Sequence, residues 1–184
     1  MPTDLFVFDH IAKCGGTSIS TMFEVAGGTV LRFHPGGARH YEGDPGKVLI
    51  CGHELFHNLP KPEGALYFTI LRDPVEVFYS QRITGVVSRK TARKALDERW
   101  DDGLALIRHK FDIDPGRDHF VGVLEKLAAT VAILSALTGM SLNPAIHTQR
   151  SNRPRVDYRR EELERALAPE IRLWEREMQD VDTE

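Results

Sequence analysis

The segment Leu5–Phe23 (LFVFDHIAKCGGTSISTMF) constrains the fold of this chain more than any other stretch of its sequence. Its first four residues are all apolar, which is typical of a strand buried on both faces of a sheet. From residue 18 onward the apolar residues recur at helical spacing, as Ile19, Met22, Phe23 and Ala26. The segment therefore predicts a strand, a glycine-containing turn and a helix in immediate succession.

The turn of this segment, Lys13–Ser18 (KCGGTS), has the composition of an anion site. A strand that turns through paired glycines into a helix directs several backbone N–H groups at one point, beside the positive end of the helix dipole. Lys13 adds a mobile cation, and the hydroxyls of Thr17 and Ser18 add donors and a candidate N-cap. We therefore expect a phosphate-binding turn. Its candidate residues are Lys13, Cys14, Gly15, Gly16, Thr17 and Ser18.

The composition fits a single domain and argues against several classes of partner. A chain of 184 residues with 41% hydrophobic residues can bury one core, so we expect one domain over residues 1–184. A formal net charge of -3 argues against a general nucleic-acid binder or a protein of anionic membrane surfaces. No run approaches the roughly 18 apolar residues of a membrane span, and no signal-peptide pattern opens the sequence.

The two cysteines indicate a reducing compartment. Cys14 and Cys51 both lie near predicted strand ends and form neither a CxxC nor a zinc-binding pattern. We therefore expect a soluble cytoplasmic protein, with no nucleic acid among its partners and no membrane span.

Further strands and helices are predicted along the rest of the chain. Short apolar runs predict strands over 29–33, 48–51, 67–71 and 119–124, and the Gly- and Pro-rich stretch 34–46 is expected to be a surface loop. Helices are expected from Pro74, over 124–137 and over 163–178, the last divided at Pro169. These elements predict an α/β fold of the P-loop type, with three layers: a central, mostly parallel sheet flanked by helices.

A histidine follows the predicted strand 48–51. In open α/β sheets, ligands bind beyond the carboxyl ends of the strands, so His53 is the first candidate for a general base. Taken alone, this segment favours the alternative, a polar residue that bonds to backbone at a strand end. His57 is a weaker candidate by position.

An arginine follows the predicted strand 67–71 in the same way. Arg72 is expected at the carboxyl edge, and Ser80 lies two helical turns beyond it, where a rise of about 1.5 Å per residue can return it toward the same anion. Alternatively, Arg72 pairs with Asp73 or Glu76, and Ser80 is an ordinary serine of the helix surface.

Two polar segments each allow two interpretations. Residues 89–118 are highly charged and form either solvated helices or a lid over the acceptor. Residues 148–155 (TQRSNRPR) are either a polar loop or a nucleotide-binding segment, in which Asn152 and Arg153 are suited to a phosphate or a base edge.

Several segments together resemble one family. The Walker A pattern and the dinucleotide pattern GxGxxG are both absent. Instead, HIAKCGGTSI resembles the 5′-phosphosulfate loop, HIPKTGGTSL, of sulfotransferases that use 3′-phosphoadenosine 5′-phosphosulfate (PAPS), particularly the carbohydrate and heparan sulfotransferase branch. FTILRDPVEVFYS resembles the 3′-phosphate segment of this family, CGHELF its GH segment, and HFVGVLEKL its FVGVTEEL-type segment. The likeness spans Asp9 to Leu127 and extends loosely through Asn152 and Arg153, whereas Ala12 replaces the usual proline.

The resemblance implies transfer of a sulfuryl group from PAPS to a hydroxyl of a carbohydrate or small molecule, with 3′-phosphoadenosine 5′-phosphate (PAP) as the second product. It implies that the Lys13–Ser18 turn holds the 5′-phosphosulfate, that Arg72 and Ser80 hold the 3′-phosphate, and that His53 takes the acceptor proton. Lys13 would neutralise the leaving phosphate, and no metal is required, because the sulfuryl group carries less charge than a phosphoryl group. The alternatives are a P-loop nucleotide or small-molecule kinase and a catalytically silent PAP-binding module.

Overall fold

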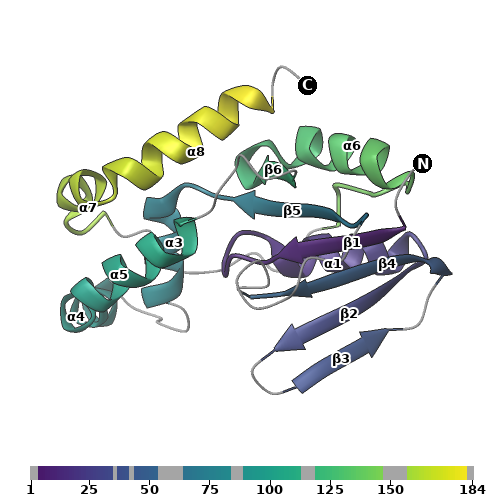
Figure 1. Ribbon diagram of the computed structural model, residues 1–184. Coiled ribbons are helices and arrows are strands. Elements are labelled where there is room, and N and C mark those ends of the chain that lie inside the picture. The colour runs from purple at the N-terminus through teal and green to yellow at the C-terminus, as the bar shows by residue number, and fades with distance from the viewer. Residues whose placement is uncertain are drawn as a thin grey trace.

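The computed structural model describes residues 4–34, 37–41, 44–53, 64–83, 89–112, 119–146 and 157–181. These residues form a six-stranded sheet in the order β3-β2-β4-β1-β5-β6 (Figure 1). All neighbours in the sheet pair in parallel except β2 and β3, which are antiparallel. The strands are β1 (Leu5–Asp9), β2 (Gly28–His34), β3 (Gly37–Tyr41), β4 (Asp44–Gly52), β5 (Leu66–Leu71) and β6 (His119–Val123).

Helices flank this sheet on both sides and at its carboxyl edge. The helical elements are α1 (Gly16–Val25), α3 (Pro74–Arg82), α4 (Arg89–Glu98), α5 (Trp100–Phe111), the short 3₁₀ helix η1 (Leu124–Lys126), α6 (Leu127–Thr138), α7 (Arg160–Ala166) and α8 (Ala168–Asp180). Helices α3, α4, α5 and α7 gather beyond the carboxyl ends of β1 and β5, and α8 runs back beside β6 (Figure 1). The predicted α/β fold with a mostly parallel central sheet is therefore confirmed.

The core explains why β1 lies at the centre of the sheet. Phe6, Val7 and Phe8 are all fully buried, as expected for a strand covered on both faces. Phe6 and Phe8 pack with Phe23 of α1 and with residues of α6, whereas Val7 packs on the opposite face with Tyr67. A second cluster joins α3, α4, α5 and α7 to the turn after β1.

The boundaries differ from the sequence prediction at three places. The expected surface loop over 34–46 is wrong, because β3 pairs with the outer edge of β2 and β4 begins at Asp44. The Gly- and Pro-rich composition predicted that the backbone groups of this stretch bond to water, but in β3 they bond to the neighbouring strand β2 instead. Helix α1 begins at Gly16 rather than Ser18, and the helix predicted over 124–137 begins with a 3₁₀ turn. The division at Pro169 is confirmed, since α7 ends at Ala166 and Pro169 lies in the first turn of α8.

The charged segment 89–118 contributes α4 and α5 in its described part. Each helix presents buried apolar residues to α3, which are Ala92, Leu96, Trp100, Leu104, Ile107 and Phe111. Within the described ranges, no helix combines the length and the apolar composition that crossing a membrane requires.

Candidate active site

The turn between β1 and α1 has two residues in the left-handed region of backbone space. Lys13 has φ 73° and Gly15 has φ 82°. Gly15 is the N-cap of α1, and its carbonyl accepts from the N–H of Ile19 at 3.1 Å. Because the helix begins at Gly16, the N–H groups of its first turn have no acceptor within the helix. The turn therefore presents backbone donors at the positive end of α1, as an anion site requires.

The predicted side-chain N-cap is wrong. Gly15 occupies the cap position, and no side chain bonds to the first turn there. The reason is conformational: the chain enters the helix through a left-handed residue, which glycine adopts without strain. Thr17 is exposed, whereas Ser18 is buried, with 7% of its surface accessible.

Lys13 and Cys14 differ in their exposure to solvent. Lys13 is exposed, and Cys14 is completely buried in the cluster that includes Ile11 and Val75. Burial raises the pKa of the Cys14 thiol, so this side chain stays protonated and apolar in character. Of the predicted anion-binding residues, Cys14 can thus contribute only its backbone.

His53 lies at the carboxyl end of β4, directly beside the turn. The parallel register pairs Asp9 with Gly52, which places His10 next to His53. The Nδ1–H group of His53 donates to the carbonyl oxygen of His10. Because a carbonyl can only accept, Nδ1 carries the hydrogen, and Nε2 of the neutral ring is the nitrogen with the lone pair. One interpretation expected His53 to bond to backbone at the strand end, and this bond is present. The bond uses Nδ1, so Nε2 can accept a proton, as a general base must.

Arg72 follows β5 on the other side of β1. Its Nη1 donates to the carbonyl oxygen of Lys13 at 3.3 Å, and its Nη2 lies 3.6 Å from the carboxylate of Glu76. Gln81 of α3 reaches the same turn, since its Nε2 donates to the carbonyl oxygen of Ala12 at 3.5 Å. The ion pair between Arg72 and Glu76, which one interpretation expected, is therefore observed, and Arg72 lies at the carboxyl edge as predicted.

Ser80 is not the helix-surface serine that one interpretation expected. It is 5% exposed and lies one residue before Gln81 on α3. The structure thus brings together the turn Lys13–Ser18, His53 and Arg72, whereas Ser80 is buried on α3, the helix from which Gln81 reaches the turn.

Asp73 fixes the start of the helix that follows Arg72. Its carboxylate caps α3 by accepting from the N–H of Val75 at 2.8 Å. Burial raises the pKa of this carboxyl group above its ordinary value, although the bonds to backbone and the charge of Arg160 act in the opposite direction. The cap keeps Arg72 at the junction between strand and helix.

Three residues near the site were not singled out from the sequence. Glu125 accepts from the N–H of Asp73 at 3.1 Å and from the indole N–H of Trp174 at 3.2 Å, so it joins α8 to the turn before α3. Arg160 of α7 lies 3.8 Å from Asp73 and 3.6 Å from Glu76. His10 is the third. His10 and Glu125 belong to the segments HIAKCGGTSI and HFVGVLEKL, which were considered as motifs rather than residue by residue.

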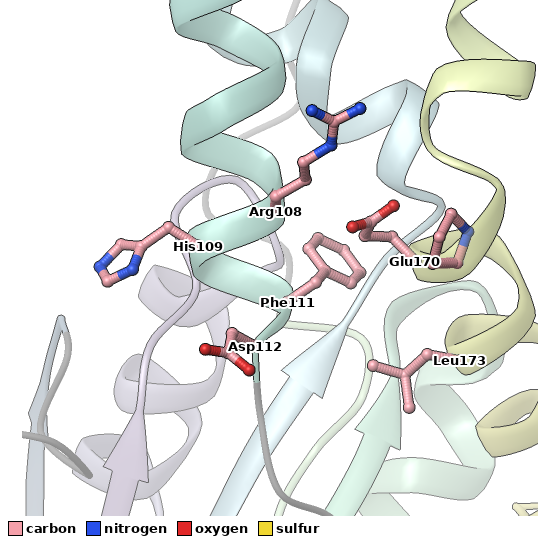
Figure 2. Close-up of a pocket in the computed structure, with 7 residues that line it drawn as sticks. Arg108, His109, Phe111, Asp112, Glu170 and Leu173 are labelled. Carbon is pink, nitrogen blue, oxygen red and sulfur yellow. The ribbon is translucent and has the colours of Figure 1, made fainter.

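A surface hollow of about 420 Å³ lies elsewhere, between the end of α5 and the start of α8. Arg108, Phe111 and Glu170 point toward one another across it, and His109 points away (Figure 2). Arg108 also donates to the carbonyl oxygen of Ala166 at 3.0 Å. None of the residues predicted for the active site lines this hollow.

Some predicted residues cannot be placed. Asn152, Arg153 and His57 lie outside the described residues. In the part of the chain that is described, no group of three or more His, Cys, Asp or Glu side chains is arranged to hold a metal ion.

The chain was compared with protein families, with curated proteins and with solved structures. No protein-family model matches the chain, and no curated protein matches it in sequence. Among solved structures, a sulfotransferase from Alicyclobacillus acidocaldarius aligns over 94% of both chains, with 16% identity and a TM-score of 0.55. Mouse sulfotransferase SULT7A1, solved in complex with PAP, aligns over 78% of this chain and 60% of its own, with 16% identity and a TM-score of 0.48. The chain therefore has the fold of the bacterial sulfotransferase.

Proposed function

We propose that the chain is a PAPS-dependent sulfotransferase that transfers a sulfuryl group to a hydroxyl acceptor. The observation that carries this proposal is the convergence of a glycine turn, a lysine, an arginine and a histidine at the carboxyl ends of three adjacent strands. The lysine and the arginine are cations suited to the two anionic ends of PAPS, and the histidine is in a tautomer that can act as a base.

The donor would lie along the turns after β1 and β5. The backbone N–H groups from Gly15 to Ser18 would hold the 5′-phosphosulfate, which is an anion of the kind that helix N-termini bind. Arg72 and Ser80 would hold the 3′-phosphate, the group that distinguishes PAPS from ATP. Asn152 and Arg153 complete the proposed donor site.

In the proposed reaction, the acceptor oxygen forms a bond to sulfur while the bond from sulfur to the 5′-phosphate oxygen breaks. Nε2 of His53 takes the acceptor proton, and Lys13 neutralises the charge that develops on the leaving PAP. The chain thus acts by positioning and charge stabilisation, and the proposed reaction requires no metal ion.

The proposed acceptor is a carbohydrate or a hydroxyl-bearing small molecule, and the proposed location is cytoplasmic. Both cysteines are free thiols, which suits a reducing compartment. The branch of carbohydrate and heparan sulfotransferases rests on the sequence motifs alone.

Donor binding can be tested by thermal denaturation of the protein titrated with PAP or with Mg-ATP. PAP should raise the melting temperature in a concentration-dependent way, and ATP, which lacks the 3′-phosphate, should do so far less. A larger effect of Mg-ATP would overturn the proposal in favour of a P-loop kinase.

Transfer can be tested by incubating the protein with radiolabelled PAPS and a panel of sugars, glycolipids and phenols. We expect label to appear on at least one hydroxyl acceptor. Binding of PAP without transfer to any acceptor would instead indicate a silent PAP-binding module.

A further inference from the structure

His10 is joined to the end of β4 through both of its backbone groups. Its N–H donates to the carbonyl oxygen of Gly52 at 2.7 Å, and its carbonyl oxygen accepts from Nδ1 of His53. The first bond continues the parallel pairing of β1 and β4 by one residue, and the second fixes which nitrogen of His53 carries hydrogen. The carbonyl oxygen of His10 therefore favours the Nδ1–H tautomer of the proposed base for as long as the ring of His53 stays aligned with it.

The side chain of His10 makes a second contact with the same residue. The two imidazole rings stack with centroids 4.5 Å apart and an angle of 27° between their planes. His10 also lies 5.7 Å, centroid to centroid, from the ring of Phe8, which is buried in the core. The ring of His53 thus rests on a ring that is itself supported by the core.

The edge of the His10 ring lies over the first residue of α1. A Cβ atom at Gly16 would lie 2.0 Å from both Cδ2 and Nε2 of His10 and 2.4 Å from Cε1. The ring therefore occupies the space that any side chain at Gly16 would need. The His10 ring contacts the start of α1, which forms the proposed donor site, and it also contacts His53, the proposed base. It therefore lies between the two.

We propose that His10 is a positioning residue, whose imidazole is a spacer that holds His53 at a fixed distance from the donor turn. The effect of His10 on catalysis rests on the proposed function. The effect of His10 on the position and tautomer of His53 does not depend on any activity. The spacer acts through ring packing, and the tautomer of His53 is maintained because the stacked ring keeps Nδ1 aligned with the carbonyl oxygen of residue 10.

The variants His10→Ala and His10→Phe separate these contributions. Alanine removes the ring but leaves the carbonyl oxygen in place, whereas phenylalanine keeps a flat ring and removes the two nitrogens. A spacer requires the ring and not its nitrogens. Phenylalanine should therefore preserve the position of His53, and alanine should not. The matched control is His109→Ala, which removes an exposed histidine at the α5–α8 hollow.

The tautomer can be measured without substrate, by long-range ¹H–¹⁵N NMR spectra of the histidine rings in the full chain. The signal of His53 is assigned by its loss in His53→Gln. We expect the Nδ1–H tautomer in the wild-type chain, in His10→Phe and in His109→Ala, and a mixture of tautomers in His10→Ala. An unchanged Nδ1–H signal in His10→Ala, or its loss in His10→Phe, would overturn the spacer.

A second measurement uses the contact between His10 and Gly16. Gly16→Ala should lower the melting temperature in the wild-type background, because its Cβ meets the His10 ring. In the His10→Ala background the same change should cost clearly less, since the three nearest atoms are gone. Equal costs in the two backgrounds would contradict the contact.

Kinetics then test the catalytic meaning. With any acceptor found active, His10→Ala should lower kcat by about 10- to 100-fold, as expected for a misplaced catalytic group, and leave PAP affinity unchanged. His10→Phe should stay within a few-fold of the wild type. Unchanged kcat in His10→Ala would refute the positioning role. If the wild-type chain transferred no sulfuryl group, the proposed function would be refuted instead. The NMR test of the His10 spacer would still be valid, because it uses no substrate.

Discussion

The guanidinium group of Arg72 donates to the carbonyl oxygen of Lys13, with 3.3 Å between Nη1 and the oxygen. Two turns that are far apart in the sequence are therefore joined directly. Lys13 has a positive φ of 73°, which is a backbone conformation that residues other than glycine adopt infrequently. The bond thus contributes to holding the turn in the shape that presents its N–H groups.

Replacing Arg72 should weaken donor binding as well as the turn. Arg72→Ala should lower the affinity for PAP by about 10- to 100-fold, since a hydrogen bond to a charged group contributes about 1.5 to 3 kcal/mol. Isothermal titration calorimetry measures this directly. The control, Arg108→Ala, removes an arginine that lines the separate hollow and should bind PAP like the wild type. Wild-type affinity in Arg72→Ala would contradict the assignment of the 3′-phosphate site.

Lys13→Ala should act on turnover. Loss of a group that stabilises charge in the transition state costs about 3 to 4 kcal/mol, so kcat should fall by roughly 100- to 1,000-fold. The effect is measured with labelled PAPS at saturating acceptor. Lys94→Ala, which removes an exposed lysine of α4, is the matched control. Turnover like that of the wild type in Lys13→Ala would place the leaving-group role elsewhere.

Gly15 and Gly27 form a matched pair for measuring a packing contact. Both have positive φ, 82° and 89°, so alanine at either position should cost about 1 to 2 kcal/mol in backbone conformation. A Cβ at Gly15 would also lie 2.7 Å from Cδ1 of Leu124, whereas nothing lies within 4 Å of one at Gly27. Chemical denaturation should therefore show the larger loss for Gly15→Ala, and Gly15→Ala should also weaken PAP binding. Equal losses would mean that Leu124 moves aside at no cost.

The two cysteine thiols should be unreactive in the folded chain. Burial raises the pKa of Cys14, and burial likewise raises the pKa of Cys51 to about 11, against an ordinary value of 9.0. At pH 8, a thiol with a pKa of about 11 is only about one part in a thousand thiolate, which is the reactive form. A thiol reagent such as Ellman's reagent should therefore react slowly with the native chain and promptly with both cysteines after denaturation.

The same shifts predict a dependence of stability on pH. The folded thiols keep their protons at a pH where the unfolded ones ionise, so the folded state binds more protons. The free energy of unfolding should therefore fall as pH rises from about 9 toward 11. Cys51→Ala should show a shallower fall over this range, and an identical slope would contradict the assignment.

Asp73 should also make the stability of the chain depend on pH, and its raised pKa gives the direction of the change. Its folded pKa is raised above the ordinary value of 3.8, so its charged form is less favourable in the folded chain than in the unfolded one. This contribution to stability is therefore greatest at acidic pH and is lost as pH rises through the folded pKa. Asp73→Asn keeps an acceptor for the N–H of Val75 without the charge. Its stability relative to the wild type should therefore be greater at pH 7 than at pH 3, by thermal denaturation.

Asp73→Ala provides the comparison for the helix cap. Alanine removes the acceptor as well as the charge, so α3 should lose about 1 kcal/mol at pH 7 relative to Asp73→Asn. If the alanine and asparagine variants were equally stable, the hydrogen bond to Val75 would have no measurable effect.

The sequence was sufficient for those parts of the site that rest on local patterns. The apolar run before the glycine turn required a buried strand, and the parallel order then required that His53 and Arg72 appear at the same edge. The features that the sequence did not predict depend on tertiary contacts. β3 forms because the edge of β2 offers partners, and the N-cap falls at Gly15 because the turn is left-handed there. The stacking of His10 on His53 depends on the register of β1 and β4, which no single segment encodes.

The position of β1 between β4 and β5 has a consequence for how the two proposed substrates are arranged. His53 and Arg72 follow strands that are two places apart in the sheet, and neighbouring strands lie about 4.8 Å apart, so the backbone fixes a separation of about 10 Å between the starting points of the two side chains. This distance is built from hydrogen-bonded backbone and cannot change when a side chain rotates. In the proposed reaction, the acceptor hydroxyl at His53 and the 3′-phosphate at Arg72 therefore bind at opposite sides of the turn after β1, where the 5′-phosphosulfate would lie between them.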